Sequence, residues 1–270
     1  MTDFWIQVLD LAQKTTATVG AQLMREFGAA QGVEKSDGSL VTESDRSADD
    51  AIRAAIHAVF PDHGLLTEET EHLFPENDWC WIVDPLDGTT NFARGLPLWG
   101  ISLALLYRGV PVFGYVAMPP LNQNYYGYWA GDTGLEMPGG AYRDGQRLQT
   151  SQDDPGGNHF FNICARSTGI LQQKVPGKVR MWGSSTYSLL VVAAGSALGA
   201  VEATPKIWDI AAVWPIVQAS GGAWSALNGD RLFPLTVGED YGTKPYPTLV
   251  VAREALLSVF GPLVAEIGSR

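Results

Sequence analysis

Cysteine and histidine are scarce in this sequence of 270 residues, which contains two cysteines and four histidines. Cys80 and Cys164 both lie in apolar, strand-like runs, which favours buried thiols over a disulfide or a thiolate metal site. The histidines are scattered and lack the spacing of a zinc site. The composition therefore indicates neither a disulfide-stabilised scaffold nor a zinc enzyme.

Basic residues are also few, with 18 against 29 acidic ones and a net charge of −11, which disfavours a nucleic-acid polymer as a partner. The longest uncharged apolar stretch, Leu189 to Val201, is too short to span a bilayer. The N-terminal sequence MTDFWIQVLDLAQ carries acids that are not typical of a signal peptide. We therefore expect a folded protein without membrane attachment, located in the cytoplasm.

Two catalytic motifs are absent as well. The sequence has neither a G-x-S-x-G elbow nor a Walker phosphate loop, which argues against a serine esterase and a P-loop enzyme. No internal repeat or low-complexity tract is present.

Periodicity predicts helices followed by strands in the first half of the chain. Helical spacing covers 4–27, before Gly28, and 46–59, before Pro61. Short strands are then predicted at 64–69, 79–84, 99–107, 111–118 and 125–130. The polar, glycine-rich stretch 139–158 is the best candidate for an internal boundary, so we expect subregions 1–145 and 146–270 within one continuous fold.

The second half alternates strand and helix. The predicted elements are strands at 159–166, 199–203 and 247–252, and helices at 186–198, 208–220 and 253–267. This alternation predicts an α/β (α+β) fold of stacked layers.

The stretch DPLDGTTNF, residues 84–92, follows a buried strand and carries two carboxylates three positions apart. Residues three apart on a strand face opposite sides, so Asp84 and Asp87 converge only if the strand ends at Asp84 and the chain bends at Pro85. Gly88 allows a backbone conformation that other residues rarely adopt, so the chain can turn there. Thr89 then begins a short helix whose free N–H groups could bind a phosphate.

Neighbouring carboxylates repel unless a cation neutralises them, and oxygen-only ligands suit a hard ion such as Mg²⁺. Asp-x-x-Asp-Gly alone is more typical of an ordinary turn, but the full string after a hydrophobic strand favours a metal site. Aspartyl-nucleophile phosphatases carry Asp-x-Asp-Gly-Thr instead, with the acids two apart, and this sequence does not fit that pattern.

Other acidic residues also lie at the ends of predicted strands or at the starts of predicted helices. Glu68 and Glu69 end the short strand predicted at 64–69, and Asp209 follows Trp208 near the start of a predicted helix. By themselves they are typical of a solvated loop and of a helix cap. Their combination with Asp84 and Asp87 favours a common metal site.

Taken together, DPLDGTTNF, the acid pair of LLTEET and WDIAA resemble the inositol monophosphatase family of Mg²⁺-dependent, lithium-sensitive phosphatases. The upstream KSDGSLVTESD, residues 35–45, is similar to a segment of that family. The resemblance covers nearly the whole chain and implies a layered αβαβα sandwich of the sugar-phosphatase type. It implies a homodimer as well.

The resemblance also implies roles for individual residues. One ion would be held by Glu68, Asp84 and the carbonyl of Leu86, and a second by Asp84, Asp87 and Asp209. A third, weaker ion would lie by Glu68, so two or three Mg²⁺ are expected. Glu68 and Thr89 would orient the attacking water, and Asp45 would support Thr89. The backbone N–H groups of Gly88 and Thr89 would bind the phosphate. Lys35 matches a family position near the site, although a lone lysine is more often a surface charge.

The resemblance implies that Glu202, seven residues before Asp209, contacts substrate hydroxyls. The turn Gly183-Ser184-Ser185 resembles the family's turn that lines the same pocket. A solvated acid at a strand end is the ordinary alternative for Glu202. We expect myo-inositol 1-phosphate as the substrate, with Asp87 and Asp209 also near it.

The sequence departs from the family pattern in one stretch, and several alternatives remain open. Val213, Trp214 and Pro215 stand where the family has small residues, and Pro215 should kink the helix that follows Asp209. Histidinol phosphate, a bisphosphate nucleotide, fructose 1,6-bisphosphate and NADP are alternative substrates for the same chemistry. A metal-binding regulatory protein that acts through a protein partner is the alternative of another class.

Overall fold

The computed structural model describes residues 3–34, 38, 40–169, 171 and 174–269. Seven described strands form a large sheet in the order β3-β4-β5-β6-β7-β8-β9, and five form a second sheet in the order β11-β10-β12-β14-β13. The large sheet consists of β3 (Gly64–Thr67), β4 (Trp79–Asp87), β5 (Gly100–Tyr107), β6 (Val110–Met118), β7 (Gln123–Tyr128), β8 (Gly140–Arg143) and β9 (Gln146–Arg147). The second consists of β10 (Phe160–Ile163), β11 (Lys178–Arg180), β12 (Gly199–Glu202), β13 (Ala223–Ala226) and β14 (Thr248–Val251).

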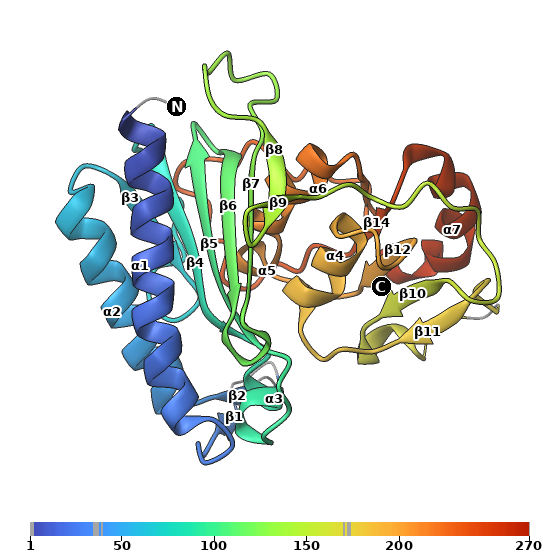
Figure 1. The fold of residues 1–270 in the computed structure, drawn as a ribbon, viewed down its shortest axis with the longest axis horizontal. Coiled ribbons are helices and arrows are strands. Elements are labelled where there is room, and N and C mark those ends of the chain that lie inside the picture. Colours follow the sequence, from blue (N-terminus) through green and yellow to red (C-terminus); the bar gives the residue numbers. More distant parts are fainter. Residues whose placement is uncertain (1–2, 35–37, 39, 170, 172–173, 270) are drawn as a thin grey trace.

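Helices separate and cover these sheets, as Figure 1 shows. α1 (Asp3–Glu26) and α2 (Glu43–Val59) cover one face of the large sheet, and α7 (Leu257–Val264) packs on the second sheet. The layer between the sheets holds α4 (Ser185–Ala193), α5 (Ile207–Ala211) and α6 (Val213–Ser220). The predicted layered α/β sandwich is confirmed.

The predicted helices are present, with corrections at their ends. α1 buries its apolar stripe, and Gly28, at φ 77°, follows its end and donates its N–H to the Phe92 carbonyl. α2 starts at Glu43 rather than residue 46, because Thr42 caps the helix and the Asp45 carboxylate accepts from the Thr42 N–H at 2.7 Å.

Three helices predicted in the second half are shorter or divided. α4 ends at Ala193, because Gly195 takes up φ 73° just beyond it. The helix predicted at 208–220 is two helices that meet at Ala212, consistent with Pro215, which has no N–H to offer the carbonyl of Ala211. The segment predicted at 253–267 is α7 flanked by short 3₁₀ turns.

The stretch 139–158, predicted as a connection, begins with two strands. β8 and β9 pair across a turn in which Asp144 (φ 51°) and Gly145 (φ 79°) both have positive φ. Asp-Gly is the usual sequence of such a tight hairpin turn, and the sequence prediction missed it. The predicted division into subregions 1–145 and 146–270 stays a prediction.

A small antiparallel pair of strands, β1 (Val33–Glu34) and β2 (Leu40–Val41), lies outside both sheets.

Hydrophobic packing holds the layers together. On one face of the large sheet, Trp81 packs with residues such as Val8 and Ile52 from the outer helices, all three fully buried. On the other face, α6 crosses so closely that a Cβ on Gly114 would lie 1.8 Å from the Ala212 carbonyl oxygen. Because both faces of the large sheet are buried against helices, the positions of its strand ends are fixed.

Candidate active site

A β-bulge brings Asp84 and Asp87 together. β4 does not end at Asp84 as predicted but continues to Asp87, with Asp84 opposite Ser102 of β5 and Asp87 opposite Gly100. Three steps along β4 therefore match two along β5, and the extra residue turns both aspartates to the same side. A proline can occupy this place because the regular ladder is interrupted there.

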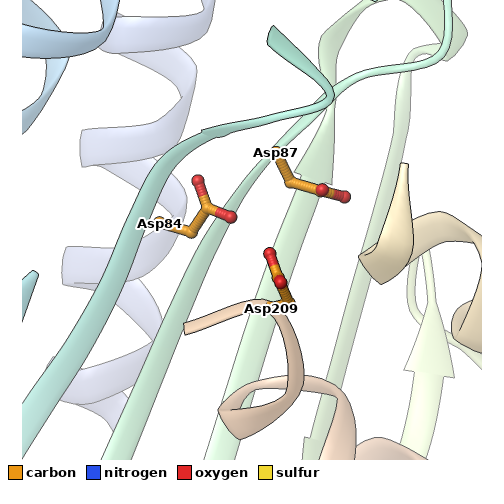
Figure 2. Close-up of side chains that lie close together, drawn as sticks. All are labelled: Asp84, Asp87 and Asp209. Carbon is orange, nitrogen blue, oxygen red and sulfur yellow. The ribbon is translucent and has the colours of Figure 1, made fainter. Parts of the chain in front are cut away.

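Asp209 completes a cluster of three carboxylates. It lies in the first turn of α5, and its Oδ2 accepts from the Lys206 N–H at 2.6 Å. One carboxylate oxygen from each of Asp84, Asp87 and Asp209 lies within 4.8 Å of the other two. Figure 2 shows the three side chains, from two different layers, lying close together. The structure thus brings these three predicted ligands together.

Glu68 approaches this cluster from the neighbouring strand. β3 runs parallel to β4, and the Glu68 N–H donates to the Val83 carbonyl at 3.1 Å. Carboxyl ends of parallel strands lie at the same edge of a sheet, so Glu68 stands beside Asp84. The charge of Glu68 contributes to a raised pKa of Asp84 and of Asp209. Glu69, the next residue, contributes to a raised pKa of Asp45 instead.

The carboxylates of the acidic cluster are buried and repel one another. Burial is the main cause that raises the pKa of Asp84 well above its usual range, and Glu68, Asp87 and Asp209 raise it further. Asp84 Oδ1 accepts from the Leu86 N–H at 3.0 Å, but its buried Oδ2 has no hydrogen-bond partner among the described residues. A buried oxygen without a partner is costly, and a hard cation would satisfy it. This donor set fits Mg²⁺.

Thr89 lies next to this cluster and links it to α2. Its hydroxyl is 2.9 Å from Asp45 Oδ1 and 3.0 Å from the Leu86 carbonyl oxygen, the predicted metal ligand. Asp45 is buried, and its Oδ2 is occupied by the backbone N–H and the hydroxyl of Thr42. Burial raises the pKa of Asp45, and the hydrogen bonds from Thr42 and Thr89 offset this in part. The predicted pairing of Thr89 with Asp45 is therefore present as a contact.

Gly88 makes the turn between Asp87 and the short helix α3 (Thr89–Ala93). It has φ 90°, and a Cβ there would lie 2.9 Å from the Leu98 carbonyl oxygen. Both its backbone conformation and the close approach of 98–99 require glycine.

Asp87 is held by the N-terminus of α4. Oδ2 accepts from the Ser184 hydroxyl and, at 2.9 Å, from the Thr186 N–H, while Oδ1 accepts from the Ser185 N–H at 3.2 Å. Burial raises the pKa of Asp87, and these bonds to the helix end offset the effect in part. The sequence prediction assigned Ser184 and Ser185 to the substrate and missed Thr186, whose backbone N–H contact with Asp87 no side-chain pattern reveals.

Glu202 ends β12 on the opposite side of α4. It is 4% exposed, and Oε2 accepts from the Ser185 hydroxyl at 3.3 Å. Burial, with a smaller contribution from the charge of Asp87, raises the pKa of Glu202 to about 8. The structure therefore joins the Gly183-Ser184-Ser185 turn to both Asp87 and Glu202. Lys35 lies outside the described residues.

The sequence matches the model of the inositol monophosphatase family over residues 5–256. It is 34% identical over 233 residues to the histidinol-phosphatase of Chlorobaculum parvum, which covers 79% of this chain and 83% of that protein. It is also 34% identical over 233 residues to the fructose-1,6-bisphosphatase/inositol-1-monophosphatase of Thermotoga maritima, covering 82% and 85%. A solved structure of a Thermotoga maritima IMPase has a TM-score of 0.78 at 30% identity, covering 96% of this chain and 99% of that one.

The chain belongs to the inositol monophosphatase family. Membership makes it a phosphatase that hydrolyses phosphomonoesters, and both relatives carry names of such enzymes. The family resemblance seen in the sequence motifs is confirmed. Within the described part of the chain, no helix has the length and apolar character needed to cross a membrane.

The buried Glu202 predicts a pH-dependent stability in metal-free protein. Its pKa is about 8 in the folded protein against an ordinary value of 4.5, so the folded state holds this proton more tightly. The resulting stability is fully present below pH 4.5 and is lost as pH rises through 8. Relative to the parent, Glu202→Gln should gain about 4 kcal/mol of stability between pH 5 and pH 8.5.

Thermal unfolding in EDTA at both pH values measures this difference. The exposed Glu254 supplies the control, since Glu254→Gln should follow the parent at both pH values. Parallel pH profiles for the parent and Glu202→Gln would contradict the buried, proton-binding state of Glu202.

Proposed function

We propose that this protein hydrolyses a small phosphomonoester with Mg²⁺, and that myo-inositol 1-phosphate is its substrate. The observation that carries the proposal is the convergence of Asp84, Asp87 and Asp209, with the buried Oδ2 of Asp84 lacking any partner among the described residues. A hard cation bound among these oxygen donors would neutralise their charges and satisfy the oxygen that lacks a partner.

The residues would divide between two ions. Glu68, Asp84 and the Leu86 carbonyl would hold one, and Asp84, Asp87 and Asp209 the other, with a weaker third ion near Glu68. Bound Mg²⁺ would lower the pKa of the attacking water and neutralise charge on the phosphate oxygens.

The protein's own groups would orient the water and relay its proton: as the Thr89 oxygen takes the proton of the water, the Thr89 hydroxyl proton passes to Asp45 Oδ1, and the leaving alcohol oxygen takes up a proton from solvent. When the Thr89 hydroxyl donates to Asp45 Oδ1, its oxygen lone pairs stay available to accept from the water. Because the pKa of Asp45 is raised, its carboxylate is a better proton acceptor than an exposed aspartate. Glu68 would orient the same water from the end of β3. Backbone N–H groups of Gly88 and Thr89 would bind the phosphate.

Substrate choice rests on Glu202 and the turn before α4. The two oxygens of a carboxyl group can form hydrogen bonds with two neighbouring hydroxyls, and the hydrogen bond from Ser185 holds Glu202 in place for this role. The related proteins bear names with different substrates, histidinol phosphate among them. The proposal of an inositol phosphate therefore depends on Glu202. The homodimer and lithium inhibition stay predictions.

Phosphate release from a panel of substrates tests the proposal. The panel contains myo-inositol 1-phosphate, histidinol phosphate, fructose 1,6-bisphosphate, a 3′,5′-bisphosphate nucleotide and NADP, each with Mg²⁺ and with EDTA. We expect Mg²⁺-dependent release that is fastest with myo-inositol 1-phosphate, and a KM for it raised at least about tenfold in Glu202→Gln.

Two other results would revise the proposal. Faster release from another member of the panel would retain the metal chemistry and replace the substrate. No release from any member, with Mg²⁺ bound, would contradict the enzymatic proposal and favour a regulatory, partner-binding role.

A further inference from the structure

Asn91 joins two segments that meet at the candidate active site, and the proposed ligand set gives it no role. It lies in the middle of α3 and is 6% exposed. Its side-chain Nδ2 donates to the carbonyl oxygen of Leu98 at 2.7 Å and to that of Trp182 at 2.7 Å. One acceptor precedes β5 and the other precedes α4. A single amide therefore connects the metal loop, residues 84–92, with both segments, the second of them 91 residues further along the chain.

The first acceptor supports the turn after Asp87. The Leu98 carbonyl oxygen is the atom that lies 2.9 Å from the position a Cβ would take on Gly88. A hydrogen bond from Asn91 therefore fixes the group that packs against this turn. Displacement of Leu98 would change the space available to Gly88 and hence the direction in which the chain leaves Asp87.

The second acceptor fixes the chain that leads into α4. Trp182 is followed by Gly183 and then by Ser184, the first of the groups that hold the Asp87 carboxylate. Gly183 has φ 71°, and a Cβ there would lie 2.8 Å from Asn91 Oδ1 and 2.9 Å from Nδ2. Asn91 thus both donates to this segment and packs directly against it.

The position of the Asp87 carboxylate depends on both the metal loop and the start of α4. Its backbone belongs to the bulge of β4, but its carboxylate is bound by Ser184, Ser185 and Thr186 of the other layer. A shift between the two layers would pull the carboxylate away from Asp84 and Asp209. We propose that Asn91 is a positioning residue that holds the α4 N-terminus on the metal loop and thereby sets the affinity for Mg²⁺. This inference rests on the proposed function, because it takes Mg²⁺ as the bound ion.

Calorimetric titration of metal-free protein with Mg²⁺ tests the role of Asn91. Asn91→Ala leaves the Leu98 and Trp182 carbonyls without this donor, and we expect the Mg²⁺ dissociation constant to rise about tenfold. Steady-state assays should show the same rise in the Mg²⁺ concentration for half-maximal rate, with a smaller loss of kcat at saturating Mg²⁺.

Asn162 offers a matched control. It is also a buried asparagine, and its Nδ2 donates to the Ser188 carbonyl at 2.8 Å, within the second sheet and α4. Asn162→Ala should lower the unfolding temperature, as a lost buried hydrogen bond does, without changing the affinity for Mg²⁺. The comparison separates general destabilisation from positioning.

A double-mutant cycle with Gly183 gives a second, independent readout. Gly183→Ala should weaken Mg²⁺ binding in the parent, because its methyl group meets the Asn91 amide. It should weaken binding less in the Asn91→Ala background, where the amide is gone. Should Asn91→Ala not fold, Asn91→Asp, which keeps the shape and replaces the donor, is expected to show the same loss of affinity.

A Mg²⁺ affinity of the folded Asn91 variants within twofold of the parent would overturn the positioning role, even if their unfolding temperatures fell. Additive effects of Gly183→Ala and Asn91→Ala would overturn the direct coupling. A parent protein that takes up no Mg²⁺ would overturn the proposed function, and this inference with it, so the parent's titration tells the two failures apart.

Discussion

Replacing Asp84 with asparagine should reduce turnover about 10³-fold, equivalent to about 4 kcal/mol of transition-state stabilisation. Asp84 is the proposed ligand shared by both ions, and its buried Oδ2 has no hydrogen-bond partner among the described residues. An amide keeps the shape of the side chain but removes the negative charge. Initial rates with saturating Mg²⁺ measure the loss.

The fold should survive this change. Charges of Glu68, Asp87 and Asp209 all raise the pKa of Asp84, so removal of its charge relieves repulsion in the metal-free protein. We expect Asp84→Asn to unfold in EDTA at or above the parent's temperature. Asp78, exposed just before the same strand, gives the control, because Asp78→Asn should retain the parent's rate. Near-normal turnover of Asp84→Asn would refute the metal assignment.

Replacing Thr89 with valine should lower kcat by about 10²-fold to 10³-fold, because the group that accepts from the water is lost. Valine has the same shape, so the contacts of the side chain with its neighbours remain. The hydroxyl lies 2.9 Å from Asp45 Oδ1, which would lose its link to the attacking water. Rates at saturating substrate and Mg²⁺ measure kcat.

Thr90 is the matched control for this variant. It is the adjacent residue of α3 and is exposed, so Thr90→Val should keep the parent's kcat. Affinity for Mg²⁺ should be nearly unchanged in both variants, since neither threonine side chain is a proposed ligand. A kcat of Thr89→Val equal to that of Thr90→Val would contradict the proposed role of the hydroxyl.

The layered fold was predictable because its strands and helices are strongly patterned. Apart from Asp84 and Ser102, the runs at 79–84 and 99–107 have no polar side chain longer than a tyrosine hydroxyl, as strands covered on both faces require, and the structure buries all but their outer ends. The ends of helices were predicted less well where one residue determines them. The Asp45 carboxylate accepts from the Thr42 N–H, so α2 begins earlier than predicted. Gly195, with a positive φ, follows the end of α4.

The candidate site was predictable where side-chain types carry the chemistry. Asp84, Asp87 and Asp209 converge in space, but the sequence did not reveal the bulge that makes this possible, because register belongs to the pairing with β5. Contacts through backbone groups were missed as well. The Thr186 N–H on Asp87 is an example, since any residue could supply it.

Binding of Mg²⁺ to the metal-free protein, measured by calorimetry for the parent and Asp84→Asn, tests the central claim most directly. The acidic cluster predicts saturable uptake by the parent and its loss in the variant, with Asp78→Asn binding as the parent does. Equal uptake by the parent and Asp84→Asn would place the ion elsewhere and contradict the account.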